Sequence, residues 1–115
     1  MSVKKALLGL ALSLMLGNGA AVAADFDKGM KAYDSQNYKG ALTEWLPLAE
    51  QGYVNAQRWL GHLYGGGQGV PLSRAIAFKW YLKAAEQGYA PAQKDVGLYY
   101  ADGLGVPEND KKAVW

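Results

Sequence analysis

The 115-residue sequence contains no cysteine and only one histidine, His62. The missing cysteines exclude a disulfide framework, a thiol nucleophile and a lipid-modified cysteine. A zinc site would need carboxylates for all its other ligands, because no second histidine is present. Ser35 and Ser73 fall at expected helix starts, where capping explains them, so a Ser-His-Asp set has no good candidate. We therefore expect no cofactor, no metal site and no enzymatic activity.

Long hydrophobic runs are also missing. The longest apolar stretch, residues 6–16, is well short of the ~20 residues that a membrane-spanning helix needs. Lysines precede this stretch and small residues follow it, which is the layout of a secretory signal peptide. We expect residues 1–23 to be a signal peptide that is cleaved after Ala23 or Ala24. The protein is then expected in the bacterial periplasm or secreted, with no stable membrane insertion.

Neither sign of charge dominates the chain. Twelve Lys and Arg residues against ten Asp and Glu residues give a formal net charge of +2. Lys4 and Lys5 belong to the expected signal peptide, so the remaining chain is close to neutral. Binding to nucleic acid needs a basic patch or stripe that neutralises phosphates. We therefore expect no nucleic-acid partner.

What the sequence does contain is an internal repeat. The stretch that starts at Gln51 starts again at Gln87, thirty-six residues later. Other matched positions that carry the same residue are Gly52/Gly88, Tyr53/Tyr89, Ala56/Ala92, Gln57/Gln93, Gly61/Gly97, Tyr64/Tyr100, Gly67/Gly103, Gly69/Gly105, Val70/Val106, Pro71/Pro107 and Ala77/Ala113. A fixed period of this length is typical of stacked supersecondary units. We expect one unit at 51–86, a second at 87–115 that is incomplete at its C-terminus, and a divergent helical hairpin at 24–50.

Apolar residues recur at helical spacing throughout these units. This spacing predicts a short helix from about Phe26 and helices over 38–50, 55–64 with Asn55 as its N-cap, 74–86, a stretch that opens with Pro91, and a last turn and a half from Asn109 or Asp110 to Trp115. Consecutive helices joined by short turns should be antiparallel. Pro47 inside the second helix predicts a kink, because proline lacks an amide hydrogen and crowds the preceding turn.

Glycines punctuate the repeat in two ways. Gly61 recurs as Gly97 inside a helix, where glycine costs roughly 1 kcal/mol relative to alanine, so we expect a neighbouring helix to pass too close for a side chain. The run 65–69 could suggest a phosphate-binding loop. It follows a helix rather than a strand, however, and lacks the lysine and Ser/Thr of such loops. We interpret the run as a tight turn between helices.

A larger set of residues at fixed spacings links these features to a known family. The residues are Ala56, Leu60, Gly61, Tyr64, Gly67, Gly69, Val70, Ala77, Trp80, Tyr81, Ala84, Ala85, Glu86, Gln87 and Gly88, in a pattern that resembles the Sel-1-like repeat. The resemblance covers nearly all of 51–115 and, more loosely, 26–50. It implies an all-α fold of antiparallel helix-turn-helix repeats, similar to tetratricopeptide repeats, stacked as a short right-handed solenoid. It also implies a role as an adaptor in protein complexes.

Positions where the two copies differ are the candidate contact residues. In the alignment of the two copies, Trp59 corresponds to Asp95 and His62 corresponds to Leu98. A position that also accommodates leucine is a poor candidate for a general base. An exposed tryptophan next to an arginine would be a plausible anchor for a partner. We expect the first helices of the units to line a concave face that binds another protein of the cell envelope. The binding residues predicted on this face are Arg58, Trp59, His62, Lys94 and Leu98.

Two alternatives stay open. The first is a cell-wall or carbohydrate-binding protein or a hydrolase, in which Asp102, Glu108 and Asp110 would contribute carboxylates. Its sugar-stacking surface would come from the aromatic residues Trp45, Trp59, Trp80, Tyr81, Tyr99 and Tyr100, for which core packing is the commoner use. The second is self-association through the C-terminal end, because the last helix is too short to supply partners for Trp80 and Tyr81.

Overall fold

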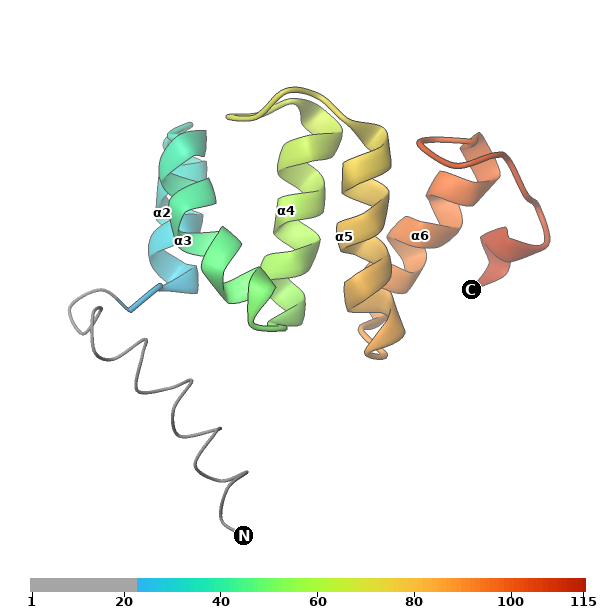
Figure 1. Cartoon of the computed structure of the whole chain (residues 1–115), viewed down its shortest axis with the longest axis horizontal. Coiled ribbons are helices and arrows are strands. Elements are labelled where there is room, and N and C mark those ends of the chain that lie inside the picture. The colour runs from blue at the N-terminus through green and yellow to red at the C-terminus, as the bar shows by residue number, and fades with distance from the viewer. Residues whose placement is uncertain (1–22) are drawn as a thin grey trace, which may run out of the picture.

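The computed structural model describes residues 23–115; the segment predicted as a signal peptide lies almost entirely outside these residues. The described part contains five α-helices, one short 3-10 helix and no strand. The helices are α2 Phe26–Asp34, α3 Tyr38–Glu50, α4 Val54–Gly66, α5 Arg74–Glu86 and α6 Ala90–Asp102, followed by the 3-10 helix η1 Lys112–Val114. Each helix packs against the next one along the chain, as the row of helices in Figure 1 shows. The predicted all-α repeat architecture is confirmed.

None of the described helices combines the length and apolar composition that crossing a membrane requires. The longest of them have 13 residues, which corresponds to about 20 Å of helix.

Two clusters of buried side chains form the core. The first joins α3 and α4 around Trp45, Leu60 and Leu63, and the second joins α5 and α6 around Tyr81 and Val96. Between these large side chains lie the buried alanines Ala41, Ala49, Ala56, Ala77, Ala84, Ala85 and Ala92. Small and large residues therefore interlock between neighbouring helices, which lets the helix axes approach closely.

The aromatic residues expected on inward faces divide into two groups. Trp45 and Tyr81 are buried, whereas Trp80, Tyr99 and Tyr100 are only partly buried and cover the edges of the two clusters. Phe78 on α5 is buried as well, although its spacing did not single it out. Most of the aromatic surface is therefore used in packing within and between repeats.

Glycines inside the helices mark where a neighbouring aromatic ring lies against the backbone. A Cβ atom at Gly61 would overlap the ring of Tyr81 on α5, and a Cβ atom at Gly29 on α2 would overlap the ring of Trp45 on α3. Trp45 and Tyr81 are thirty-six residues apart, but Gly29 and Gly61 are thirty-two apart because the turn after α2 is four residues shorter. The α2–α3 hairpin thus repeats the packing of α4–α5.

A second repeated contact joins consecutive units through glutamine side chains. The Nε2 atom of Gln57 donates to the Ala49 carbonyl at 3.0 Å, and the Nε2 atom of Gln93 donates to the Ala85 carbonyl at 3.1 Å. Each bond reaches from the start of one unit to the last turn of the helix before it, where carbonyl groups lack partners within the helix. This contact gives a physical reason for the identity of Gln57 and Gln93.

The glycine turns have the role expected from the sequence. Gly67 and Gly103 end α4 and α6 in the left-handed conformation, with φ angles of 63° and 65°. Gly69 and Gly105 have positive φ angles too, and a Cβ atom at either one would overlap the backbone at the start of the second helix of the preceding unit. Side chains are therefore excluded from these turns both by conformation and by space.

The predicted N-cap of α4 is wrong. The helix begins at Val54, after Tyr53 in an extended conformation, and the Asn55 side chain accepts a hydrogen bond from the adjacent Ala56 amide instead. The physical reason is that the Tyr53 amide donates to the Leu48 carbonyl, so the end of α3 and the start of α4 are fixed together.

Of the two expected serine caps only Ser73 forms, since its Oγ atom accepts from the Ile76 amide at 3.1 Å. The prediction for Ser35 is wrong, because this residue ends α2 with its hydroxyl donating to the Lys31 and Ala32 carbonyls, and Asn37 caps α3 instead.

Two further predictions concern the shape of single helices. Figure 1 shows α3 changing direction in its second half, where Pro47 lies, as expected. The last helix is shorter than predicted, with only the three residues of η1 in a 3-10 conformation. The Oδ1 atom of Asn109 accepts hydrogen bonds from the amides of Lys111 and Lys112, where this segment begins.

Candidate functional site

The five predicted binding residues lie on α4 and α6, where they form two distinct groups. Arg58, Trp59 and His62 on α4 are partly buried and contact other side chains of the chain. Lys94 and Leu98 on α6 are exposed. Matched positions of the repeat therefore differ in environment, and each group is best considered separately.

Arg58 links α4 to α6. Its Nε atom lies 2.6 Å from Oδ2 of Asp95, and its Nη2 atom lies 3.4 Å from Oδ1 of the same carboxylate. The hydrogen bond to Asp95 raises the pKa of Arg58 above its usual value. Only 27% of the Arg58 side chain and 14% of the Asp95 side chain are exposed. This ion pair holds consecutive units together, so Arg58 is not free to serve as an independent contact for a partner.

Trp59 is half-buried rather than fully exposed. Its ring lies 5.1 Å from the Tyr33 ring on α2, 5.4 Å from the Trp45 ring on α3 and 4.8 Å from the His62 ring. The preceding hairpin supplies aromatic neighbours for Trp59, whereas Asp95 at the same repeat position meets an arginine. The structure therefore gives Trp59 a packing role and leaves only part of its surface open to solvent.

His62 lies between two aromatic rings. Its Nδ1 atom is 2.6 Å from the Tyr81 hydroxyl, and its ring stands nearly perpendicular to that of Trp59. Burial lowers the pKa of His62, and the positive charge of Arg58 lowers it further, while Asp95 acts in the opposite direction. Burial also raises the pKa of Tyr81. Both groups are therefore held neutral near pH 7, as members of a packed polar contact.

Four exposed residues of α6 form a line along the helix, which we call the α6 stripe. It consists of Pro91, Lys94, Leu98 and Asp102, whose spacings of three and four residues place them on one face. Leu98 is 52% exposed, although it is a large apolar residue. Within the described residues, no hydrogen bond or ion pair engages the side chains at positions 94 and 102. The α6 stripe is thus an open surface with an apolar centre and charged ends.

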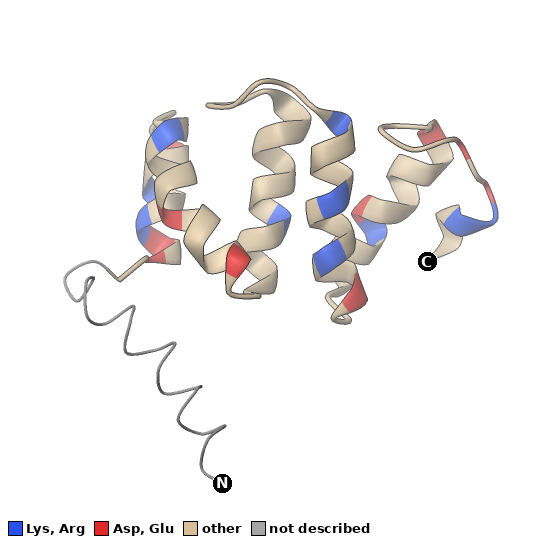
Figure 2. Ribbon diagram, in the orientation of Figure 1, with Lys and Arg blue, Asp and Glu red and all other residues tan. Residues whose placement is uncertain are grey.

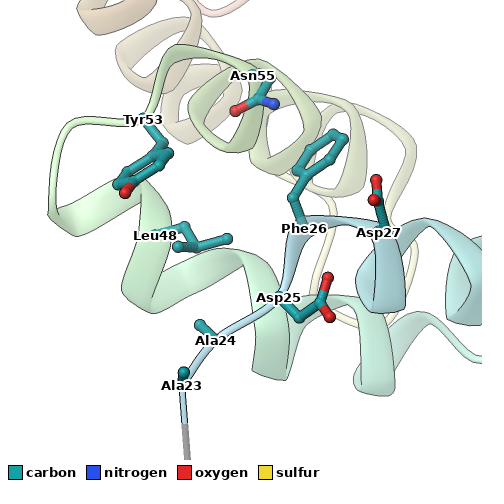
Figure 3. Close-up of a pocket in the computed structure, with 8 residues that line it drawn as sticks. All are labelled: Ala23, Ala24, Asp25, Phe26, Asp27, Leu48, Tyr53 and Asn55. Atoms are coloured by element: carbon teal, nitrogen blue, oxygen red, sulfur yellow. The ribbon is translucent and has the colours of Figure 1, made fainter.

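A shallow hollow lies at the other end of the molecule. It has a volume of about 460 Å³ and is bordered by Phe26 and Asp27 of α2, Leu48 of α3, and Tyr53 and Asn55 at the start of α4. Figure 3 shows these side chains around it, with acidic residues only on the α2 side. No sequence pattern indicated this feature, because its walls come from three separate segments.

The carboxylates of the hydrolase alternative are dispersed. Asp102, Glu108 and Asp110 are all exposed, and among residues 23–115 no three His, Cys, Asp or Glu side chains are grouped closely enough to hold a metal ion. The structure brings together no pair of these carboxylates in an enclosed pocket within that range. The three carboxylates are therefore open to solvent and lie apart from the hollow beside α2.

Comparison with known proteins agrees with this fold. The sequence profile of the Sel1 repeat matches residues 4–31, 54–89 and 90–115. The first range overlaps the segment predicted as a signal peptide, and the others begin three residues after the predicted units. No curated protein matches the chain.

The solved structures that resemble this chain include the following two. One is a Sel1 repeat protein from Oxalobacter formigenes, with 40% identity and a TM-score of 0.74, covering 78% of this chain and 37% of that one. The other is c5321, a protective antigen of uropathogenic Escherichia coli strains with an SLR fold, with 28% identity and a TM-score of 0.72, covering 76% of this chain and 20% of that one. The chain therefore spans well under half the length of either relative.

Proposed function

Because this chain belongs to the Sel1 repeat family, we propose that it is an exported interaction module that binds another protein of the cell envelope as an adaptor or inhibitor. Helical repeats of this kind present extended surfaces to partner proteins. Export is supported by the signal-like layout of residues 1–23. The observation that carries the proposed binding role is the α6 stripe, where an apolar side chain is exposed between charged ends.

The contrast with α4 explains why the α6 stripe is the favoured surface. On α4 the corresponding side chains, Arg58 and His62, contact Asp95 and Tyr81. On α6 the side chains of Lys94 and Leu98 are exposed. Protein interfaces combine an apolar centre with a polar rim, and the largest energetic contributions cluster near the centre. Leu98 would be such a centre, with Lys94 and Asp102 in the rim.

A capture experiment tests the binding role. The purified protein is immobilised and exposed to envelope extract, in parallel with Leu98→Asp and with the control Ile76→Asp, which changes an exposed apolar residue on α5. We expect Leu98→Asp to lower recovery of a specific partner about tenfold or more, because a carboxylate replaces the apolar centre of the contact. The control should retain the partner, and direct binding of the two purified proteins should repeat the difference. Equal recovery by all three proteins would count against the α6 stripe.

Export has a separate test. The protein is isolated from fractionated cells and its mass is measured, with a variant that lacks residues 2–23 as the control. We expect the mature chain to begin at Ala24 or Asp25 and to be found outside the cytoplasm, whereas the shortened variant should stay inside. An intact chain that still begins at Met1 and fractionates with cytoplasmic proteins would contradict the export proposal.

A further inference from the structure

We propose that the export cut falls between Ala24 and Asp25 and that Glu44 binds the amino group freed at Asp25. Hydrolysis of this peptide bond consumes one water molecule: Ala24 leaves as a carboxylate, and the Asp25 nitrogen becomes an ammonium group. The inference rests on the proposed export. It adds a structural role for the cut, because the new amino group fastens α2 to α3.

The backbone nitrogen of Asp25 already contacts Glu44. Its amide donates to the Oε1 atom of Glu44 at 2.9 Å. Asp25 also caps α2, because its side chain accepts from the Lys28 amide, and this cap fixes the position of the nitrogen. Figure 3 shows Ala23, Ala24 and Asp25 on the stretch that leads into α2, so a chain that begins at Asp25 loses no residue of the helix. The freed ammonium group therefore lies beside the carboxylate without any movement of the helix.

The charges around this nitrogen favour an ammonium group. Only 15% of the Glu44 side chain is exposed, and its Oε2 atom lies 3.6 Å from the ammonium group of Lys28, whose side chain is 72% exposed. Figure 2 shows acidic and basic residues in the part of the hairpin where the chain enters α2. Asp25 and Asp27 add two carboxylates at the start of α2, and the Tyr53 side chain lies across the hollow. Hydrogen bonds between charged groups are roughly twice as strong as neutral ones, so the cut strengthens the contact with Glu44.

The helix that this contact holds is short. α2 has nine residues, of which only Gly29 is buried, and a helix of this length depends on its neighbours for stability. Next to Asp25, the Phe26 ring stacks on the Trp45 ring at 5.7 Å, and the Nε1 atom of Trp45 donates to the Phe26 carbonyl at 3.2 Å. A stronger contact at Asp25 stabilises this same end of the hairpin. The precursor, which has a neutral amide at this position, should therefore hold α2 less firmly than the mature chain.

A thermodynamic cycle tests the contact. The chain 25–115 is prepared with a free amino group and with that group acetylated, which restores a neutral amide, and both forms are also made with Glu44→Gln. Urea unfolding at pH 7 measures the equilibrium constant for unfolding. We expect Glu44→Gln to raise this constant about fivefold more in the free chain than in the acetylated chain, because only the free chain loses a contact between charged groups.

The pH dependence of unfolding provides a second readout. The Glu44 carboxylate should raise the pKa of the Asp25 amino group above its usual value of about 7.7. The contribution of the ammonium group to stability is then complete below about pH 7.7 and is lost as the pH rises through the raised pKa. The free chain should therefore lose stability between about pH 7.5 and about pH 9.5, and acetylation or Glu44→Gln should remove this loss. Glu50→Gln, which changes an exposed carboxylate on α3, is the control and should leave the loss unchanged.

The mass of the exported protein completes the test, and we expect the chain to begin at Asp25. A mature chain that begins at Ala24 would overturn the inference and leave the proposed export standing. Equal effects of Glu44→Gln on the free and acetylated chains would do the same. A chain that still begins at Met1 and stays in the cytoplasm would remove both proposals.

Discussion

Helices α4 and α6 occupy the same place in successive units, have 13 residues each and yet present different surfaces. In α4, the ring of Tyr81 packs against the backbone of Gly61, and His62 contacts the Tyr81 hydroxyl. In α6, the backbone carbonyl of Ala113 in η1 lies against the matched Gly97. Its neighbour Leu98 is exposed. The element that comes after each helix in the chain therefore decides whether a repeat position is covered or open.

This difference shows where a repeat protein can vary in function without changing its fold. The glycines and alanines that let α4 and α6 approach their neighbours are the same in both units. The residues between them differ, and each type suits the side chains that it contacts. Trp59 packs on the aromatic residues of α2 and α3, and Asp95 binds an arginine of α4. An outward position is therefore available for binding only where the next element leaves it uncovered.

The largest effect on stability is expected when each of these two glycines is replaced by alanine, which adds a methyl group. We expect Gly61→Ala to lower the free energy of unfolding by about 2 kcal/mol, because the Tyr81 ring must move and the gain in helix propensity offsets only part of that cost. Gly97→Ala should change it by less than about 0.5 kcal/mol, since the three-residue η1 is easily displaced. Urea unfolding followed by circular dichroism measures both values. Equal losses would show that η1 is held as firmly as α5.

Gly29→Ala extends the same test to the N-terminal hairpin. Its Cβ atom would overlap the ring of Trp45, so its effect should resemble that of Gly61→Ala rather than that of Gly97→Ala. A small effect at Gly29 would mean that the α2–α3 hairpin packs less tightly than the unit that comes after it.

Much of the fold could be predicted from the sequence because the same pattern of residues occurs in two copies. The helices over 38–50 and 74–86 match the predicted ranges, and the glycine turns recur at fixed positions. The relation of Gly29 to Gly61 was missed because the turn after α2 is four residues shorter, which breaks the alignment. The length of η1 was overestimated because helical spacing alone gives no measure of the neighbours needed to hold a short final turn.

The candidate site was harder to predict than the fold. The alignment identified positions that differ between copies, but it could not show that Arg58 reaches Asp95 across thirty-seven residues. Nor could it show that Trp59 is half-buried, because its neighbours Tyr33 and Trp45 come from a hairpin without a matching turn. Both outcomes depend on contacts between units, and periodicity within one unit carries no information about them.

The ion pair between α4 and α6 is expected to contribute an intermediate amount to stability. A double-mutant cycle with Arg58→Ala and Asp95→Ala should give a coupling energy of about 1 kcal/mol, because both side chains are largely shielded from solvent. The same cycle for Lys28 and Glu44, which lie 3.6 Å apart with the lysine 72% exposed, should give about 0.2 kcal/mol. A coupling near zero for Arg58 and Asp95 would remove the proposed link between units.

The smallest effect concerns the acid sensitivity of His62, tested with His62→Leu, which places the residue of α6 on α4. Burial lowers the pKa of His62 in the folded protein below the usual value of 6.5, so the unfolded chain binds a proton more readily. The contribution of the neutral His62 side chain to the free energy of unfolding is therefore complete above about pH 6.5, and it is lost as the pH falls towards the lowered pKa. His62→Leu should remove this part of the pH dependence in urea unfolding between about pH 7.5 and about pH 5.5. Because His62 is the only histidine, an unchanged slope in the variant would show that the ring titrates alike in the folded and unfolded chains.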